Sequence, residues 1–241
     1  MKYFGTVLTE SKPHDQGYHT MTLCAPEIAD TAKPGQFVMI YLKDKQHLLP
    51  RPISIYDVNR EKGLITLVYV VVRAGTKIMS RWPMWHSVGV MGPLGKGFNA
   101  DFPKGEKIAI VGGGVGVAPL FFLTKELKEC QVDVYLGFRD NAPEFASLFE
   151  NAQISTKGLV TDLLPKDPEY AAILTCGPIP MLKAVADYAH LHNIPCQVSL
   201  EERMACGLGA CKGCVVKTMI RYQLCCDDGP VFNSKEVNWD V

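Results

Sequence analysis

The chain has 241 residues, 47% of them hydrophobic, and its 25 basic and 25 acidic residues give a formal net charge of zero. The balanced charge argues against a nucleic-acid-binding or anionic-membrane surface, because both would need a basic excess. No apolar run approaches the roughly 18 residues of a membrane span, and the first residues lack the apolar core of a secretory signal. Nine cysteines without such a signal indicate a reducing, cytoplasmic setting, where clustered thiols more often hold metal or do redox work.

The first domain, residues 1–99, is predicted to be a small antiparallel β-barrel. Short runs rich in Val, Ile, Thr, Tyr and Phe are separated by Gly, Pro, Asp and Asn, which is the spacing of a small barrel or sandwich. The strand runs cover residues 2–10, 18–26, 35–42, 51–58, 63–72 and 87–95. A short helix is expected at residues 76–82.

Two motifs in this domain are candidate phosphate receptors. The run Arg51–Ser54 places a cation and a hydroxyl around a proline-fixed bend, and Gly75-Thr76 follows a strand run and opens the short helix. Arginine side chains and helix N-termini both bind phosphate. Taken singly, each motif is more often a surface arginine or an ordinary turn.

The second domain, residues 100–201, is predicted to be an α/β domain with a parallel sheet. Strand runs at 106–114, 132–140, 171–178 and 196–202 alternate with helical patterns at 117–130 and 179–193. Such alternation implies right-handed crossovers between parallel strands.

Two strand-to-helix turns in this domain mark a candidate nucleotide crevice. The glycines of Gly112–Gly116 let a pyrophosphate approach the backbone at a helix N-terminus, and Cys176–Pro178 forms a second turn at the same sheet edge. A tight turn without a ligand is the alternative for the first, and a plain buried residue is the alternative for Cys176. The strand run at 132–140, which follows the first turn, ends in Arg139 and Asp140. This ending does not identify the residue that would contact the ribose of the nucleotide, so the choice between NAD and NADP stays open.

The third unit, residues 202–241, holds five of the nine cysteines. Cys206, Cys211 and Cys214 follow the C-x4-C-x2-C spacing of plant-type [2Fe–2S] proteins, which add a fourth cysteine further on. Cys225 and Cys226 are the candidates for that position; Cys226 is favoured because it is further from Cys214 and leads into DDGPVF. Structural zinc is the alternative, but it favours paired C-x2-C knuckles and only one such pair is present.

In this order along the chain, the motifs resemble the ferredoxin-NADP reductase superfamily. The segments LEERMACGLGACKGCVVK and CDDGPVF narrow the resemblance to the electron transfer subunits of dihydroorotate dehydrogenase B. The resemblance covers essentially the whole chain. It implies an α+β multidomain protein with an FAD-binding antiparallel β-barrel, an NAD-binding α/β domain and a small ferredoxin-like cluster domain.

The resemblance also implies roles for individual residues. FAD contacts are expected from Arg51, Pro52, Ile53, Ser54, Val68, Tyr69, Val70, Gly75 and Thr76. The nicotinamide nucleotide, NAD rather than NADP, is expected at Gly112, Gly113, Gly114, Gly116, Cys176, Gly177 and Pro178, with Cys176 near the reacting ring. Iron is expected on Cys206, Cys211, Cys214 and Cys226, although the segment between the last two is short for the family.

The function implied is that of an oxidoreductase subunit in pyrimidine biosynthesis. Electrons would pass between NAD and the FMN of a dihydroorotate dehydrogenase catalytic subunit through FAD and the cluster, in a heterotetramer with two copies of each subunit. A flavin is needed because nicotinamide exchanges two electrons together and the cluster takes one. The cysteine loop, Cys206–Cys214, and its flank carry apolar residues that are the expected contact face for the partner subunit. Packing of these residues against the barrel domain is the alternative. They are Met204, Ala205, Leu208 and Ala210.

Two rival functions stay open at this stage. The small subunits of sulfide dehydrogenase and of ferredoxin-dependent transhydrogenase share the arrangement of flavin and cluster. They tend to carry Asp at the first cluster position, so Cys206 favours the dihydroorotate function. A zinc-stabilised scaffold with a decayed nucleotide fold is the non-enzymatic alternative.

Overall fold

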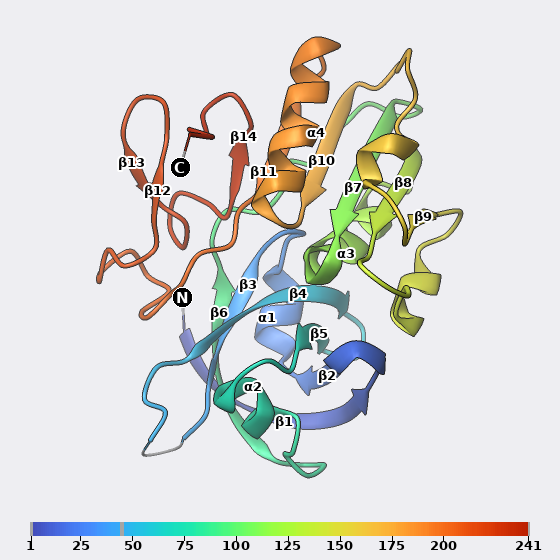
Figure 1. Ribbon diagram of the computed structural model, residues 1–241. Helices are drawn as coiled ribbons and strands as arrows, with labels where there is room; N and C mark the ends of the chain where they lie inside the picture. The colour runs from blue at the N-terminus through green and yellow to red at the C-terminus, as the bar shows by residue number, and fades with distance from the viewer. Residues whose placement is uncertain (1, 44–45, 241) are drawn as a thin grey trace.

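The computed structural model describes residues 2–43 and 46–240. Residues 1 and 241, the outer bounds of two predicted domains, lie outside this range. Three sheets are present in the described chain: a closed barrel, a six-stranded sheet and a two-stranded hairpin. Figure 1 shows the barrel below and the larger sheet above it, with the hairpin at the upper left beside that sheet.

The barrel contains all six predicted strands. Its neighbours run in the order β1-β2-β5-β4-β3-β6, and every pairing is antiparallel. Alternate side chains such as Met21, Leu23 and Ile55 are fully buried inside it, as expected for strands whose side chains point to opposite faces. The bounds are β1 (Lys2–Pro13), β2 (Tyr18–Cys24), β3 (Phe37–Tyr41), β4 (Arg51–Asn59), β5 (Leu64–Val70) and β6 (Ser87–Leu94).

Two short helices accompany the barrel. The helix α2 (Ala74–Met79) overlaps the helix predicted at residues 76–82, but it begins two residues and ends three residues earlier. The helix α1 (Pro26–Thr31) was not predicted; it begins at a proline and buries Ile28 and Ala29 against the barrel core. Proline suits the first turn of a helix because it has no N–H to leave unsatisfied.

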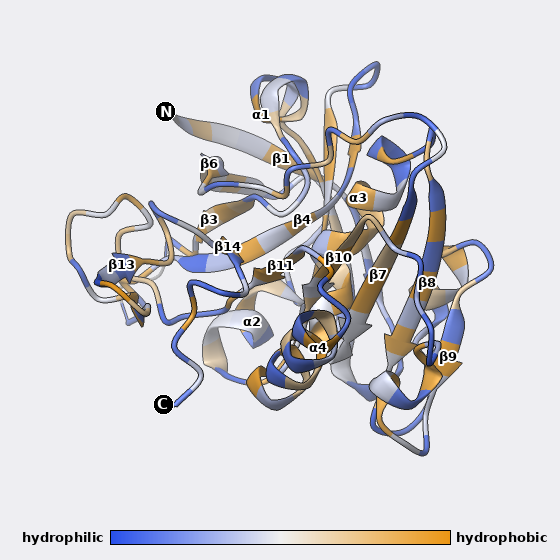
Figure 2. Cartoon of the chain, turned by 90° about the horizontal axis from the view of Figure 1, so that it is seen from above, coloured by the Kyte–Doolittle hydropathy of each residue, from blue (hydrophilic) through white to orange (hydrophobic). Residues whose placement is uncertain are grey.

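The second sheet is parallel in its central part. Its order is β14-β11-β10-β7-β8-β9, and only β14 is antiparallel to its neighbour. Successive residues of β7 face opposite cores: Ile108 and Ile110 pack with α3, whereas Ala109 and Val111 pack with α4. The two helices therefore cover opposite faces, as Figure 2 shows from above. The bounds are β7 (Lys107–Gly113), α3 (Ala118–Glu126), β8 (Gln131–Gly137), β9 (Gln153–Ser155), β10 (Ala172–Cys176), α4 (Ile179–Leu191) and β11 (Cys196–Ser199).

The last part of the chain, residues 202–240, is called the cysteine segment below. It forms the hairpin β12 (Val215–Lys217) and β13 (Tyr222–Leu224), then β14 (Val231–Asn233), which adds an antiparallel edge to the parallel sheet through β11. Its buried Cys214, Cys225 and Cys226 share one apolar core with residues from both other sheets. The cysteine segment is therefore packed on the rest of the protein rather than tethered to it.

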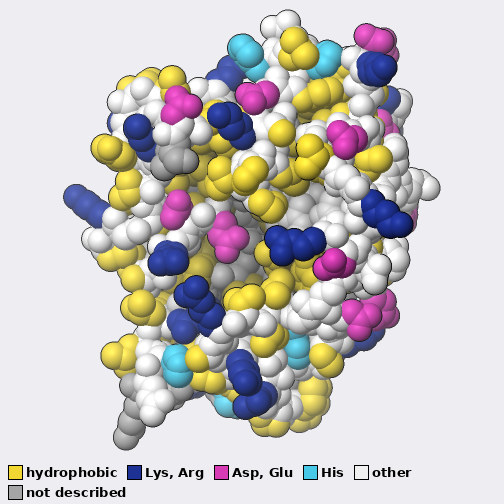
Figure 3. Space-filling model, viewed as in Figure 1, with side chains coloured by type: hydrophobic (Ala, Val, Ile, Leu, Met, Phe, Trp, Pro, Cys, Tyr) yellow, Lys and Arg dark blue, Asp and Glu magenta, His cyan; other side chains and the backbone are white. Residues whose placement is uncertain are grey.

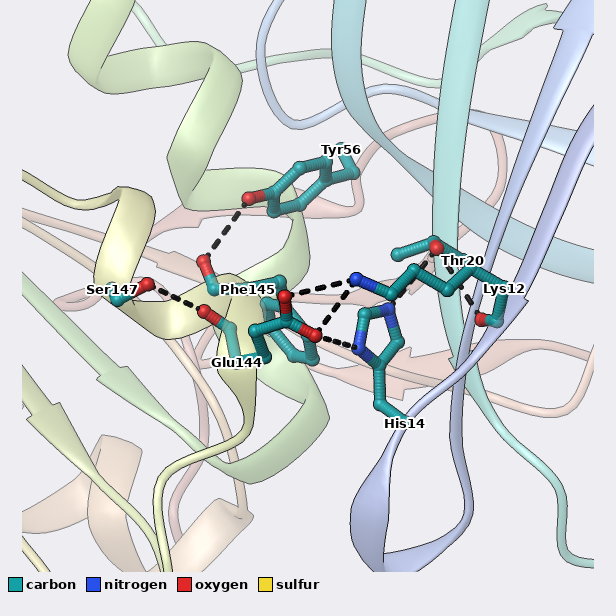
Figure 4. Close-up of polar contacts among 7 residues, drawn as sticks. All are labelled: Lys12, His14, Thr20, Tyr56, Glu144, Phe145 and Ser147. Carbon is teal, nitrogen blue, oxygen red and sulfur yellow. Dashed lines mark hydrogen bonds and ion pairs between the residues drawn. The ribbon is translucent and has the colours of Figure 1, made fainter.

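Polar and aromatic contacts fix the barrel against the parallel sheet. Lys12 and His14 of the barrel reach Glu144, at 2.8 Å and 3.5 Å, in the 3-10 turn η3 (Glu144–Leu148). Tyr56 donates a hydrogen bond to the Phe145 carbonyl, 3.3 Å away, so these contacts converge on one turn (Figure 4). Tyr56 also stacks on Phe121 of α3 with ring centroids 4.6 Å apart.

Candidate functional site

The two strand segments expected to hold the flavin lie on neighbouring strands but are not paired with each other. Residues 51–54 of β4 pair with β3, and residues 68–70 of β5 pair with β2. The pairing of β4 with β5 begins where Asn59 lies opposite Leu64 and ends where Ile55 lies opposite Leu67, with an irregularity at Tyr56. Among the described residues each segment therefore presents a backbone edge without a strand partner, and a ligand can use its N–H and C=O groups.

Arg51 and Gly75 come together beside this edge. A Cβ on Gly75 would lie 2.2 Å from the Arg51 Nε, so a glycine is required for the guanidinium to lie across the first turn of α2. The Arg51 Nη1 donates to the Leu49 carbonyl at 2.6 Å, which steadies the side chain. Thr76 Oγ1 accepts a hydrogen bond from the Val72 backbone N–H at 3.0 Å and fixes the turn before α2.

The two strand-to-helix turns of the parallel sheet touch through their backbones. A Cβ on Gly116 would lie 2.5 Å from the Gly177 Cα, and one on Gly113 would lie 3.1 Å from the Pro178 Cδ. Cys176 also pairs with Gly112 in the β10–β7 ladder. Three of the four glycines in the first turn thus serve close packing, which a side chain would prevent.

Gly114 differs from the other three glycines. Its φ is +56°, and a Cβ there would meet only the Tyr18 hydroxyl of the barrel, 4.0 Å away. The turn therefore opens toward the barrel at this residue. In Figure 3 the surface is hollowed where the barrel, the parallel sheet and the cysteine segment meet.

Cys176 ends β10 beside this opening and is half-buried. Burial of the thiol is the main cause that raises its pKa to about 12; a hydrogen bond with Ser199 opposes the shift, and the charge of Glu201 adds to it. The thiol is therefore neutral at physiological pH. The neighbouring Thr175 Oγ1 is buried without a hydrogen-bond partner among the described residues.

The cysteine loop directs backbone N–H groups at sulfur. The Sγ of Cys206 accepts from Leu208 N at 3.3 Å and from Cys211 N at 3.4 Å. The Sγ of Cys226 accepts from Gly209 N at 3.1 Å. Such N–H···S bonds stabilise thiolate sulfur and are one of the factors that set the potential of a bound cluster.

The four cysteines expected to hold iron are arranged as two pairs. The Cys211 backbone N–H donates to the Cys206 Sγ at 3.4 Å, and the Cys226 backbone N–H donates to the Cys214 Sγ at 3.4 Å. The first pair is on the outer side, with Cys206 half-buried and Cys211 exposed, whereas the second pair is buried. No three His, Cys, Asp or Glu side chains of the described chain converge on a single ion position. A two-iron cluster takes two protein ligands on each iron.

Cys225 faces away from the loop. Its thiol donates to the Leu200 carbonyl at 3.3 Å and is fully buried. Burial, together with the charges of neighbouring thiols and glutamates, raises the pKa of Cys225. Its neighbour Cys226, by contrast, is the residue that contacts the loop at Gly209.

The thiols of Cys206 and Cys226 differ in acidity. Burial opposes ionisation of Cys206, but hydrogen bonds from the Cys211, Leu208 and Ala210 positions outweigh it and lower the pKa of Cys206 to about 7. Burial and the hydrogen bond with Cys214 raise the pKa of Cys226 to about 12. Iron binding would have to remove the proton from Cys226, since metal ligands bind as thiolates.

The other residues next to these motifs range from exposed to half-buried. Arg139, Asp140, Glu201 and Glu202 are exposed. Of the expected partner-contact residues, Leu208 and Ala210 are exposed, whereas Met204 and Ala205 are half-buried. Tyr18, opposite Gly114, and Ser199, beside Cys176, were not predicted from the sequence, because only the folded register brings them there. None of the described helices is long and apolar enough to span a membrane.

Comparison with known proteins identifies the family of the chain. Residues 201–238 match the iron-sulfur cluster binding domain of dihydroorotate dehydrogenase B. The chain is 40% identical to the dihydroorotate dehydrogenase B (NAD(+)) electron transfer subunit of Desulforamulus reducens, covering 91% of this chain and 92% of that protein. It is 41% identical to the subunit of the same name from Clostridium acetobutylicum, covering 85% and 86%.

Solved structures agree with this fold. The structure of an NADH-dependent reduced ferredoxin-NADP oxidoreductase superposes with a TM-score of 0.87 at 28% identity, over 98% of this chain and 90% of that one. Phthalate dioxygenase reductase, at 13% identity and a TM-score of 0.64, shares the fold over 78% of this chain and 64% of that one. The chain belongs to the family of dihydroorotate dehydrogenase B (NAD(+)) electron transfer subunits.

Proposed function

We propose that this chain transfers electrons between NAD and a catalytic partner subunit that oxidises dihydroorotate, using FAD and a [2Fe–2S] cluster. The observation that carries the proposal is the arrangement of the four thiols as two pairs, in which every sulfur accepts a hydrogen bond from a backbone N–H. Two ligand pairs suit two irons, and N–H donors suit sulfur that carries negative charge.

The ligands proposed for the cluster are Cys206 and Cys211 on one iron and Cys214 and Cys226 on the other. Cys226 is preferred to Cys225 because its sulfur faces the loop, whereas that of Cys225 donates to the Leu200 carbonyl. The outer pair is the more exposed of the two, so we assign it the exchange of electrons with the partner.

The barrel offers FAD a phosphate receptor and an open backbone edge. Arg51 supplies the positive charge for the phosphates, beside the turn of Gly75 and Thr76. The unpaired edges of residues 51–54 and 68–70 supply N–H and C=O groups to the ring. Bound flavin exchanges electron pairs with nicotinamide and single electrons with iron–sulfur clusters, and the protein positions and tunes it.

The crevice between the two glycine turns is the proposed NAD site. Gly114 opens toward the barrel, so a nucleotide lying there would meet the flavin edge. Cys176 ends the neighbouring strand with a neutral thiol, which would place no charge beside a nicotinamide ring. We therefore assign Cys176 a role in packing the ring rather than in proton transfer or covalent catalysis.

The proposed partner is an FMN-containing dihydroorotate dehydrogenase subunit, in a heterotetramer with two copies of each chain. The surface around the cysteine loop supports a docking role. Leu208 is 40% exposed, and the hairpin tip adds Ile220 at 93% and Tyr222 at 72%. A cavity of about 350 Å³ beside the loop is lined by Lys212, Val215, Arg221, Tyr222, Leu224 and Asp228.

The test is to purify the natural complex without oxygen and measure NADH formation with dihydroorotate as the electron donor. Dihydroorotate-dependent turnover supports the proposal, whereas turnover with sulfide or reduced ferredoxin alone would overturn it. Reduced ferredoxin is included as an electron donor because the 28%-identical structure named above is that of a ferredoxin-NADP oxidoreductase. A colourless, zinc-containing chain would overturn both.

A further inference from the structure

We infer that Met39 is a positioning residue that holds the cysteine loop at a fixed distance from the flavin segment of the barrel. The inference rests on the proposed function, because it takes residues 51–54 as the flavin segment and Cys206 as an iron ligand. It assigns a role to a buried methionine of β3, which lies outside every motif recognised in the sequence.

The first observation is the direction of the Met39 side chain. Val38 and Ile40 of β3 belong to the core inside the barrel, whereas Phe37 and Met39 belong to the core shared with the cysteine segment. Met39 therefore points out of the barrel toward that segment, as the alternation of a strand requires. It is fully buried there.

The second observation is the contact between Met39 and the loop. A Cβ on Gly207 would lie 2.7 Å from the Met39 Cγ, 3.1 Å from its Sδ and 3.2 Å from the Leu94 Cδ1. Gly207 has a φ of +71° and directly follows Cys206. The loop backbone therefore rests on Met39 at the residue next to a proposed ligand, with no room between them for a methyl group.

The third observation is the strand pairing on the other side of Met39. Met39 is directly opposite Pro52 in the β3–β4 ladder. Residues directly opposite each other share one face of the sheet, with Cβ atoms about 5 Å apart. Ile53 and Ile55 point into the barrel, so Pro52 lies on the outer face with Met39. One side chain thus lies between the loop of the cluster and the strand of the flavin.

Two consequences follow for the electron-transfer reaction. Electron transfer slows steeply as two redox centres move apart, so a side chain that sets their separation controls the rate of that step. The apolar shell around a metal centre also limits solvent access and so affects its potential. Met39 and Leu94 form that shell on the barrel side, which makes the cluster potential sensitive to a polar or shortened residue 39.

The experiment compares Met39→Ala and Met39→Leu with Met21→Ala in the complete complex. Met21 is an equally buried barrel methionine, but it faces the barrel core. Two quantities are measured: the rate of cluster reduction after mixing with NADH, by rapid-freeze electron paramagnetic resonance, and the midpoint potential of the cluster. The reduction of FAD by NADH is recorded in the same mixing experiment.

We expect Met39→Ala to slow cluster reduction severalfold and to raise the cluster potential, while FAD reduction keeps its rate. Met39→Leu conserves volume and should restore most of both values. Met21→Ala should lower thermal stability and leave both values unchanged. If the two alanine variants have the same rate and potential, Met39 is only a packing residue and the inference is wrong.

A pair of variants covers the case in which Met39→Ala loses its cluster. Gly207→Ala places a methyl group against Met39 and should reduce the iron bound per chain. Adding Met39→Ala to Gly207→Ala removes the clash and should restore part of the iron, although the positive φ still disfavours alanine. An absence of restoration would contradict direct contact. A wild-type complex without flavin or iron signals would instead refute the proposed function.

Discussion

Substituting Gly116 by alanine tests the nucleotide crevice through a clash that the backbone cannot avoid. The new Cβ would lie 2.5 Å from the Gly177 Cα and 2.6 Å from its N. Ordinary van der Waals contact begins at 3.4 Å, so the two turns would have to separate by about 0.9 Å to remove the clash, because the atoms met are main-chain atoms. Overpacking of this kind costs about 1–3 kcal/mol. If that cost falls on nucleotide binding, NADH affinity drops by about 5- to 150-fold.

The assay is the NADH dependence of FAD reduction, measured by stopped-flow absorption. We expect Gly116→Ala to need more NADH for half-maximal reduction, with unchanged FAD and iron content, because both cofactors are held elsewhere. Gly63→Ala is the matched control: its Cβ would lie 2.8 Å from the Pro26 Cβ, in the turn between β4 and β5. It should lower stability without changing the NADH requirement. An unchanged NADH requirement in Gly116→Ala, or an equal increase in both variants, would refute the assignment of the crevice.

Three further predictions concern the other two cofactor sites. Cys226→Ser should abolish the cluster while Cys225→Ser keeps most of the iron, because only the sulfur of Cys226 faces the loop; iron analysis decides, and the reverse pattern would assign the fourth ligand to Cys225. Arg51→Met should lose FAD on gel filtration while the cluster remains, since it removes the charge proposed to bind the phosphates; a normal FAD content would contradict this role. In the metal-free chain, thiolate is the reactive form, so alkylation of Cys206 should rise between about pH 6 and 8 because its pKa is lowered to about 7. Cys226, with a pKa of about 12, should stay largely protonated over this range and be alkylated slowly. Mass spectrometry measures alkylation at each cysteine. Parallel pH profiles for the two cysteines would show that the N–H groups do not favour the Cys206 thiolate.

Much of the fold follows from local sequence pattern. Each of the six barrel strands begins within a predicted run, because antiparallel strands with one buried face carry a clear alternation of apolar residues. Four strands also end within their runs, whereas β1 and β4 extend beyond theirs by three residues and by one residue. The contact of the two glycine turns was also foreseeable, since the carboxyl ends of neighbouring parallel strands meet at one sheet edge. The run at 63–72 was predicted too long: β5 ends at Val70, and the apolar residues beyond it lead into α2.

The parts that escaped prediction lack a local signal. The helix α1 has six residues and no side-chain hydrogen bond at its N-cap, and the three-residue strands β12 to β14 are too short to show a period. The attachment of β14 to β11 depends on pairing between distant segments. The contact of Met39 with Gly207 likewise joins residues from opposite ends of the chain, and no spacing in the sequence could indicate it.

The most direct measurement is an anaerobic NADH titration of the native complex, followed by visible absorption and low-temperature electron paramagnetic resonance. Our account predicts that added NADH bleaches the flavin bands and that the resonance of a reduced [2Fe–2S] cluster grows in the same samples. A preparation from the native complex whose flavin bleaches while the cluster stays oxidised, although dithionite reduces it, would contradict the proposed path of the electrons.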